Sequence, residues 1–481
     1  MNVVHGADWQ HQAGPLDHPR EECGVVGVYL PGGDAARTAF FGLFALQHRG
    51  QESAGIAAAD GHDVNVHTAM GLVTQSFRET DFAPLRGPLA IGHTRYSTTG
   101  ASRACNAQPL LVRGQHGVLA LAHNGNIINA LQLKHQLQDQ WACEFNSTTD
   151  SEAIAYLLAN APGQTWEERA FYCMRNLEGA FSFTALTPTA MMAVRDPLGI
   201  RPLCLGQLNG GWIVASESCA LEHLGATFLR EVDPGEVIVI NEQGPRSAYY
   251  SGSKGQRALC VFEMIYFSRP DSVLDGRQVH SVRQALGAQL AVEHPVDADL
   301  VIGVPDSSIA AAVGYARESG IPYSEGLVKN RYVGRTFIQP EQRLRDLGVR
   351  QKFNPLPEVI EGQRLVVVDD SIVRGTTTPH VVNLLRAAGA KEIHLRVCAP
   401  PIRHPCYMGV DMATRRELVA ANKTIPEIQE MIGADSLGYL SVAGLMKVVR
   451  GNRGGFCDAC FTGNYPVPIQ LEWDKLALEK P

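Results

Sequence analysis

RLVVVDDSIVRGTTT, which spans Arg364 to Thr378, decides the fold of the second half of the chain. Leu365 to Val368 are apolar, which is typical of a strand covered on both faces, and two acids follow where that strand should end. A glycine and three threonines then precede a helical pattern, so free N–H groups and hydroxyls should converge at a helix N-terminus. Taken alone, the acids could cap a strand and Gly375 could form a turn. The whole pattern indicates a site for a phosphorylated ribose.

Two more segments of the second half repeat this arrangement. ADLVIGVPDSS, which ends at Ser308, is an apolar run followed by a loop, and IHLRVCAPP supplies a further strand. Apolar residues recur at helical spacing after two of the runs, at Ile309, Ala312, Val313 and Ala316 and at Val381, Leu384, Leu385 and Ala388. Alternating strands and helices predict a Rossmann-like parallel sheet, whose ligands bind at the carboxyl ends of the strands.

The first half has a different pattern. From Cys23 to about residue 250, short β-like runs are separated by Gly, Asn and Asp turn signals, and helical patterns interrupt them at 38–47 and 151–160. This predicts layered sheets with helices outside. The polar stretch SGSKGQ at 251–256 reads as a linker. The predicted domains are therefore 1–22 as a leader, 23–256, 257–466, and a tail at 467–481.

Composition limits the possible functions. A chain of 481 residues should form two or more domains, and its net charge of -7 favours neither nucleic acid nor a membrane surface as a partner. No apolar run is long enough to span a membrane, and the first 22 residues lack a secretory apolar core, so we expect a cytoplasmic protein. Eleven cysteines without an export signal indicate reduced thiols, metal ligands or a nucleophile.

Cys23 is the first residue of the first predicted strand, in REECGVVGVYL, Arg20 to Leu30. A thiol that attacks an amide needs a proton acceptor, which is most often a histidine. Cleavage after Glu22 would give Cys23 a free α-amino group with a pKa of about 7.7 to 8.0, which could accept that proton. Residues 1–22 would then be a propeptide. Taken alone, however, Cys23 would more often be an ordinary buried cysteine.

Four motifs follow Cys23: QHRGQESAG at 47–55, GHTRYSTTG at 92–100, AHNGNI at 122–127 and STTDSE at 147–152. In this order and spacing, residues 23–250 resemble the N-terminal-nucleophile glutamine amidotransferases, which implies an αββα sandwich. By position, the resemblance assigns Cys23 as the nucleophile, with the Asn124 side chain and the Gly125 N–H as its oxyanion hole. Without the other motifs, Asn124-Gly125 would read as a hairpin turn. The residues implied in glutamine binding are Arg49 and Gly50, which would line the pocket, Arg95 for the α-carboxylate, and Asp150 for the α-ammonium.

The Arg364 to Thr378 stretch resembles the signature of the type I phosphoribosyltransferases, whose Gly/Thr loop holds the 5-phosphate of phosphoribosyl pyrophosphate. VPDSS would bind the pyrophosphate. The resemblance implies Mg²⁺ on Ser307, Asp369 and Asp370, and Mg²⁺ commonly uses one or two carboxylates plus substrate phosphates. The implied substrate-binding residues are Asp306, Ser307, Ser308, Lys329, Arg331, Lys352, Asp369, Asp370, Ser371, Arg374, Gly375, Thr376, Thr377 and Thr378.

Residues 329–354 carry seven Lys or Arg against two acids, a local charge of +5. Such a segment could be a solvated surface loop. Beside a pyrophosphate site in a chain of net negative charge, it reads better as a lid that closes over the substrate and excludes water. Lys329, Arg331 and Lys352 are its predicted substrate contacts.

Together the two halves, from Cys23 to about Pro466, resemble the glutamine phosphoribosylpyrophosphate amidotransferases. The resemblance implies conversion of phosphoribosyl pyrophosphate, glutamine and water to 5-phosphoribosylamine, pyrophosphate and glutamate, the first committed step of purine synthesis. It also implies inhibition by purine nucleotides and a homodimer or homotetramer. The alternatives are a regulator that binds phosphoribosyl pyrophosphate without turning it over, an amidotransferase that uses another acceptor, and a structural iron-sulfur protein.

Four further cysteines match the branch of this family that has both a propeptide and a [4Fe-4S] cluster. A Cys-x-x-Cys pair alone is a weak signal that could equally serve zinc. Two distant partners and the predicted propeptide favour the cluster. Its expected ligands are Cys260, Cys406, Cys457 and Cys460.

Overall fold

The computed structural model describes residues 23–96, 100–253, 255–330, 353–412, 414–450 and 455–469. These residues form two compact units. The larger unit contains residues 23–283, 403–415 and 446–469, and the smaller unit contains 284–402 and 416–445. The larger unit therefore includes segments from the C-terminal half of the chain. The domain limits given by the sequence stay predictions, and the predicted propeptide lies outside the described residues.

The larger unit contains a seven-stranded antiparallel sheet in the order β11-β9-β10-β1-β4-β2-β3. Its register places three motifs at one edge. Gly24 lies opposite Thr94 and Ser53 lies opposite Arg95, so the starts of β1 and β2 meet the end of β4. The strands are β1 Gly24–Tyr29, β2 Ser53–Ala59, β3 Val64–Met70, β4 Leu89–Arg95, β9 Cys204–Leu208, β10 Gly211–Ala215 and β11 Thr227–Glu231.

A six-stranded antiparallel sheet in the order β13-β12-β8-β7-β6-β5 packs against the first sheet. Small and branched side chains from both sheets, including Val25, Ile91, Ala120 and Ile238, form the apolar layer between them. The strands are β5 Leu110–Gly114, β6 Gly117–Ile127, β7 Gly179–Leu186, β8 Met191–Arg195, β12 Glu236–Asn241 and β13 Gly244–Tyr249.

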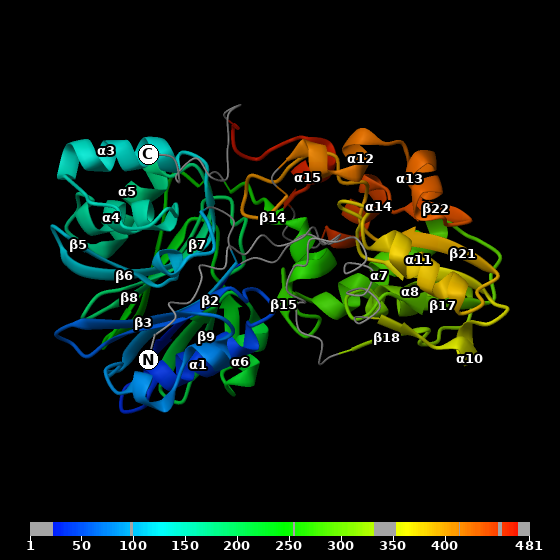
Figure 1. Ribbon diagram of the computed structural model, residues 1–481. Helices are drawn as coiled ribbons and strands as arrows, with labels where there is room; N and C mark the ends of the chain where they lie inside the picture. Colours follow the sequence, from blue (N-terminus) through cyan, green and yellow to red (C-terminus); the bar gives the residue numbers. More distant parts are fainter. Residues whose placement is uncertain are drawn as a thin grey trace, which may run out of the picture. The chain divides into compact units, whose positions relative to one another are not determined.

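Helices cover the outer faces of both sheets of the larger unit (Figure 1). α1 (Ala35–Ala45) and α6 (Ser218–His223) share a buried core with the seven-stranded sheet. The helices α3 (Ala130–Trp141), α4 (Ser151–Asn160) and α5 (Trp166–Asn176) share another with the six-stranded sheet. The predicted αββα sandwich is confirmed.

The predicted helix at 151–160 agrees with α4, but α1 begins earlier than the predicted helix at 38–47. The Asp34 carboxylate accepts a hydrogen bond from the Arg37 N–H at 2.9 Å, so a capping residue starts the helix before the apolar pattern becomes clear. Short elements complete this part of the chain: α2 Val73–Ser76, η1 Glu79–Phe82 and η2 Ala104–Asn106.

The remaining elements of the larger unit follow residue 257. A parallel pair joins β14 (Leu259–Cys260) to β23 (Phe456–Cys457), and a π-helix, η3 (Glu263–Phe267), follows β14. The other elements are β15 Val273–Leu274, β16 Arg277–Gln278 and α15 Ala459–Thr462. The two units divide within α7 Val279–Glu293, η4 Arg415–Glu417 and α14 Val442–Val449.

The smaller unit contains the predicted parallel sheet, in the order β17-β20-β21-β22. β20 is central and its residues Leu365 to Val368 are fully buried, as the apolar run predicted. The strands are β17 Leu300–Gly303, β20 Arg364–Asp369, β21 Glu392–Val397 and β22 Ser436–Tyr439, with the antiparallel pair β18 Leu327–Lys329 and β19 Phe353–Pro355. The helices are α8 Ile309–Ser319, α10 Pro357–Ile360, α11 Thr378–Ala387, α12 Val419–Asn422 and α13 Ile425–Ile432.

In the part of the chain that the structure describes, no helix combines the length and the apolar character that crossing a membrane would require.

The helical layer over the six-stranded sheet offers a test of packing. Leu158 in α4 is fully buried, whereas Leu131 in α3 is 46% exposed. Leu158→Ala should lower the free energy of unfolding by about 2–5 kcal/mol, because it removes buried methyl groups and leaves a cavity. Leu131→Ala should change it by less than about 0.5 kcal/mol. The midpoint of thermal unfolding measures both, and equal midpoints would contradict this packing.

Candidate active site

Cys23 lies just before β1 and is buried, with its thiol donating a hydrogen bond to the Tyr96 carbonyl at 3.3 Å. Burial raises the pKa of the Cys23 thiol to about 11; the Tyr96 contact and Arg95 oppose this rise, while Glu52 and Asp150 add to it. Only the thiolate is a strong nucleophile. In the described part of the chain, no histidine hydrogen-bonds this thiol. Among the residues that the structure describes, the thiol therefore has no evident histidine base.

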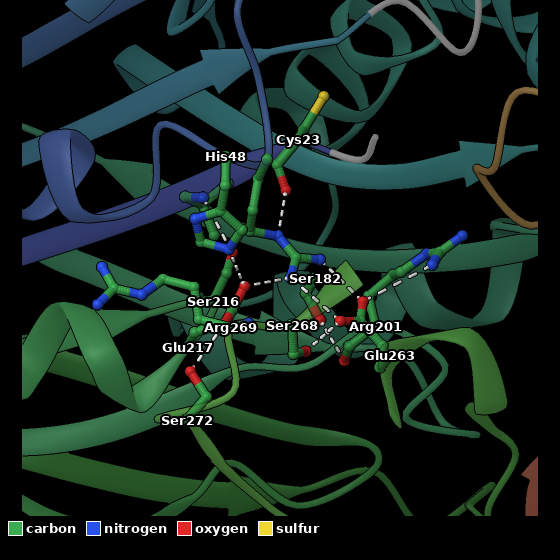
Figure 2. A network of polar contacts seen from close by, with 12 residues as sticks. Cys23, His48, Ser182, Arg201, Ser216, Glu217, Glu263, Ser268, Arg269 and Ser272 are labelled. Atoms are coloured by element: carbon green, nitrogen blue, oxygen red, sulfur yellow. Dashed lines mark hydrogen bonds and ion pairs between the residues drawn. The ribbon is translucent and has the colours of Figure 1, made fainter. Parts of the chain in front are cut away.

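Arg49 holds the backbone of Cys23. Its Nε donates to the Cys23 carbonyl at 3.1 Å, while its terminal nitrogens bind Glu217 at 2.6 Å and Glu263 at 2.8 Å. All three charged side chains are almost fully buried. Figure 2 shows the Cys23 carbonyl facing this network and its sulfur pointing away from it. The sequence predicts Arg49 in a glutamine pocket, and the structure adds a contact with the backbone of Cys23, the predicted nucleophile.

Gly50 lies against the end of β4. A Cβ at this position would come within 2.6–2.7 Å of backbone atoms of Thr94 and Arg95, so the close approach requires glycine. Arg95 in turn pairs with Glu52, their charged atoms 3.6 Å apart, and donates to the Ala101 carbonyl at 3.2 Å. The first two motifs thus form one structural group beside Cys23.

Asn124 and Gly125 lie on β6, which crosses the second sheet. Asn124 is 1% exposed and its Nδ2 has no hydrogen-bond partner in the described structure. A buried amide donor without a partner carries a free-energy penalty unless a ligand satisfies it. Gly125 has a φ of 145°, and a Cβ there would collide with the Ala180 carbonyl. An unpaired donor and an obligatory glycine suit the predicted oxyanion hole.

Asp150 precedes α4 and connects it to β6. Its carboxylate accepts a hydrogen bond from the Ile127 N–H at 2.9 Å and lies 3.8 Å from the His123 Nδ1. The Ser151 hydroxyl bonds the same imidazole nitrogen at 3.0 Å. Asp150 and β6, the strand of the predicted oxyanion hole, are therefore held together. The charges of Arg95, Glu52 and Asp150 all act on the Cys23 thiol, so the predicted motifs converge.

A second polar site lies at the carboxyl end of β20 in the smaller unit. The Ser307 hydroxyl donates to Asp370 at 2.5 Å, and the Ser308 hydroxyl donates to Asp369 at 3.3 Å. Ser371 also donates to Asp370, at 2.6 Å. The acids that follow β20 thus meet the serines that follow β17. Two carboxylates at one sheet edge fit Mg²⁺ that would complete its shell with water and phosphate oxygens.

The phosphate loop follows these acids. Gly375 adopts a φ of 69°, and Thr376, Thr377 and Thr378 lead into α11, at whose N-terminus Thr377 stands. Arg374 pairs with Glu417 at 2.7 Å.

Lys329, the first predicted lid residue, pairs with Asp306 at 2.7 Å. This contact joins two residues to which the sequence assigned substrate binding. Arg331 and Lys352 lie outside the described residues, as does most of the predicted lid.

Four cysteines surround one cavity in the larger unit. Cys260 lies opposite Cys457 in the β14–β23 pair, and the cavity is also lined by Cys406 and Cys460. The rest of its lining is mostly apolar, and the Met408 N–H approaches the Cys406 sulfur at 3.4 Å. Burial, together with the neighbouring thiols, raises the pKa of Cys457 to about 12. In the described ranges, no three His, Cys, Asp or Glu side chains come close enough to hold a single metal ion. The four thiols and their apolar surroundings fit the predicted set of cluster ligands.

Comparisons with known proteins identify both halves of the chain. Residues 93–223 match a glutamine amidotransferase domain, and residues 280–424 match a phosphoribosyl transferase domain. The amidophosphoribosyltransferase of Synechococcus elongatus is 50% identical over 96% of this chain and 95% of its own length. That of Bacillus subtilis is 49% identical over 93% and 95%. The chain belongs to the amidophosphoribosyltransferase family. It is therefore an enzyme of the first step of purine biosynthesis, as the sequence predicted.

Solved structures of the family agree with the fold. A structure described as the allosteric regulatory enzyme of purine biosynthesis has a TM-score of 0.87 and 48% identity, over 94% of this chain and 97% of its own. The glutamine phosphoribosylpyrophosphate amidotransferase of B. subtilis, solved with ADP and GMP, has the same TM-score and identity, over 94% and 98%. The predicted two-part architecture is confirmed.

Sequence reasoning missed the carboxylates of this site. The sequence motifs assign no role to Glu52, Glu217 or Glu263. A signal was present, because Glu263 is the one charged residue in the apolar run VFEMIYF, and a charged residue is seldom buried without a partner. Its partner, Arg49, lies 214 residues away in the chain.

The raised pKa of Cys23 can be tested by alkylation. In protein whose mass shows that residues 1–22 are retained, we expect the iodoacetamide reaction at Cys23 to accelerate about tenfold per pH unit up to a pKa of about 11, because the thiolate fraction rises at that rate. Peptide mass spectrometry measures it, with the exposed Cys105 as a reference for reagent access. A plateau near neutral pH in the uncleaved chain would contradict this environment.

Proposed function

We propose that this chain converts phosphoribosyl pyrophosphate, glutamine and water to 5-phosphoribosylamine, pyrophosphate and glutamate. The observation that carries the proposal is the convergence of Arg49, Arg95 and Asp150 on the buried Cys23. A regulator without catalysis would have no use for this arrangement. An amidotransferase with another acceptor would have no use for the serine and aspartate site after β17 and β20.

Cys23 is the proposed nucleophile. After cleavage behind Glu22, its α-amino group would take the thiol proton as Sγ attacks the glutamine δ-carbon. The Asn124 amide and the Gly125 N–H would stabilise the oxyanion, where losing one donor typically costs about 3–4 kcal/mol. The carbon–nitrogen bond then breaks, the proton passes to the departing ammonia, and water hydrolyses the γ-glutamyl thioester to glutamate.

Glutamine would be held by charges at the same edge of the sandwich. Arg95 is the proposed partner of its α-carboxylate and Asp150 of its α-ammonium, with Arg49 and Gly50 lining the pocket. Glu52 would neutralise Arg95 while the pocket is empty, because the two charged groups lie 3.6 Å apart.

Phosphoribosyl pyrophosphate is the proposed ligand of the smaller unit. Asp369 and Asp370 would bind the ribose hydroxyls and, with Ser307, a Mg²⁺ ion, which would neutralise the pyrophosphate. The loop from Ser371 to Thr378 would hold the 5-phosphate. Ammonia would then attack C1 of the ribose as pyrophosphate departs. The Lys329–Asp306 pair would be exchanged for contacts with the pyrophosphate.

A [4Fe-4S] cluster is the proposed occupant of the cysteine-lined cavity. Cys260, Cys406, Cys457 and Cys460 would hold it, and the apolar lining supports this assignment because it would shield the cluster from solvent. The cluster would supply a covalent clamp between β14 and the segments around Cys406 and α15. The chain would thereby belong to the branch of the family that has a propeptide, residues 1–22, and a cluster.

We further propose purine nucleotides as inhibitors, a homodimer or homotetramer, and a cytoplasmic location. The relative from B. subtilis was solved with ADP and GMP, which supports nucleotide binding in the family.

Because glutamine cleavage and transfer of ammonia to the ribose are assigned to different domains, Cys23→Ser should abolish only the first. Glutamine-dependent formation of phosphoribosylamine should fall to background because the nucleophile is gone, while synthesis from free ammonia should continue in the other domain. Coupled assays for glutamate and pyrophosphate measure both rates. Cys143→Ser, at a buried cysteine outside the site, is the matched control. Equal loss of both activities in Cys23→Ser would contradict the assignment.

The cluster assignment predicts the metal content. Anaerobically purified protein should contain about four iron and four sulfide per chain, with visible absorption typical of such clusters. Cys457→Ser should lose most of both, because a ligand is missing, whereas the exposed Cys105→Ser should lose neither. Zinc without iron in the parent protein would overturn the assignment.

A further inference from the structure

We propose that Glu263 and Glu217 are positioning residues for glutamine cleavage, which hold Cys23 in place through Arg49. This inference rests on the proposed role of Cys23. Neither carboxylate belongs to the motifs that define the site, and neither contacts the thiol. Each acts on the main chain of the nucleophile through the same guanidinium (Figure 2).

The Arg49 guanidinium has a fixed orientation because carboxylates bind it on two sides. Glu263 binds it as a fork, with Oε1 2.8 Å from one terminal nitrogen and Oε2 3.1 Å from the other. Glu217 binds at 2.6 Å. A bidentate pair fixes the plane of the guanidinium as well as its position. The Nε that remains is thereby directed at the Cys23 carbonyl, 3.1 Å away.

Glu263 is itself held rigidly. It is fully buried in the π-helix η3, where the Ser268 hydroxyl donates to its Oε2 at 2.5 Å. Arg283 binds the carbonyls of Met264 and Ser268 at 3.1 and 2.7 Å, which fixes the turn that carries it. Arg201 approaches Glu263 at 3.9 Å from the other side. The carboxylate therefore has little freedom to follow a shift of Arg49.

Glu217 has an equally complete set of partners. It accepts hydrogen bonds from the Ser272 hydroxyl at 2.7 Å and the Arg269 N–H at 2.8 Å, and it pairs with His48 at 2.7 Å. Burial alone would raise the pKa of Glu217, but His48 and Arg49 outweigh it and hold the pKa well below the ordinary value. Glu217 is therefore ionised, and both of its carboxylate oxygens accept hydrogen bonds from the surrounding donors.

The Cys23 carbonyl matters because one residue carries both the nucleophile and the proposed base. Anchoring this carbonyl limits rotation of the Cys23 backbone, and with it the placement of Sγ and of the α-amino group. A misplacement of about 1 Å can cost about 100-fold in rate. The carboxylates should therefore affect the chemical step more than the binding of glutamine.

The test is Glu263→Gln, which keeps the shape of the side chain but directs an amide N–H₂ at a guanidinium that can only donate. We expect kcat with glutamine to fall about tenfold or more, KM for glutamine to change less than about twofold, and the ratio of glutamine-dependent to ammonia-dependent rates to fall in parallel. Glu236→Gln is the matched control. It breaks another bidentate ion pair of the larger unit whose carboxylate is buried, with Arg230 at 2.6 and 2.7 Å, and should leave this ratio unchanged.

Ser268→Ala is a milder second variant, which removes one hydrogen bond to Glu263 and keeps every charge. It should lower the same ratio about two- to fivefold, and it answers the question if Glu263→Gln does not fold. An unchanged kcat in the folded variants, or a rise in KM alone, would overturn the proposal. The parent protein and Cys23→Ser separate this result from the function itself. If Cys23→Ser keeps glutamine-dependent activity, the nucleophile is wrong; if it loses that activity while the Glu263 and Ser268 variants keep theirs, only the positioning role fails.

Discussion

Cys23 stands at the start of β1, an inner strand of a packed sheet, and the arrangement of the candidate site depends on this position. β1 lies between β4 and β10, and its register with β4 brings the residue before Gly24 beside Arg95. The start of β2 also meets the end of β4, so Gly50 and Glu52, which precede β2, lie beside Arg95. Strand pairing thus fixes where the loops that surround Cys23 begin and end. The chemistry thus depends on sheet register before it depends on any side chain.

Burial sets the second condition. Burial of Cys23 raises the pKa of its thiol, which disfavours the thiolate that the proposed catalysis needs. The same burial strengthens every hydrogen bond and charge pair around it. Without Glu217 and Glu263, Arg49 would be a buried charge with no counter-ion, and removing one partner of a buried pair typically costs about 3–5 kcal/mol. Two carboxylates around one arginine are therefore a consequence of placing a cation behind the nucleophile.

The sequence predicted what depends on local pattern. The parallel sheet, the buried run Leu365 to Val368, and α4 followed from apolar periodicity, and the acids after β20 lie where the strand ends. It predicted contacts between distant segments only where a shared site implied them, as for the four cysteines. It placed segments 403–415 and 446–469 in the domain at 257–466, whereas they belong to the same compact unit as the first half of the chain. The Arg49–Glu263 pair spans 214 residues, so its existence could be suspected from a lone buried acid but not its partner.

The larger unit places two distinct chemistries close together in the fold. Asn126 donates to the Tyr407 carbonyl at 2.9 Å, and Arg201 bonds the Met408 carbonyl while facing Glu263. The loop that begins at Cys406 therefore touches both the oxyanion strand and the network behind Cys23. Cys260, three residues before Glu263, lines the same cavity as Cys406. Whatever fixes these cysteines also fixes the backbone behind Cys23, so the proposed cluster would stabilise the proposed glutamine site.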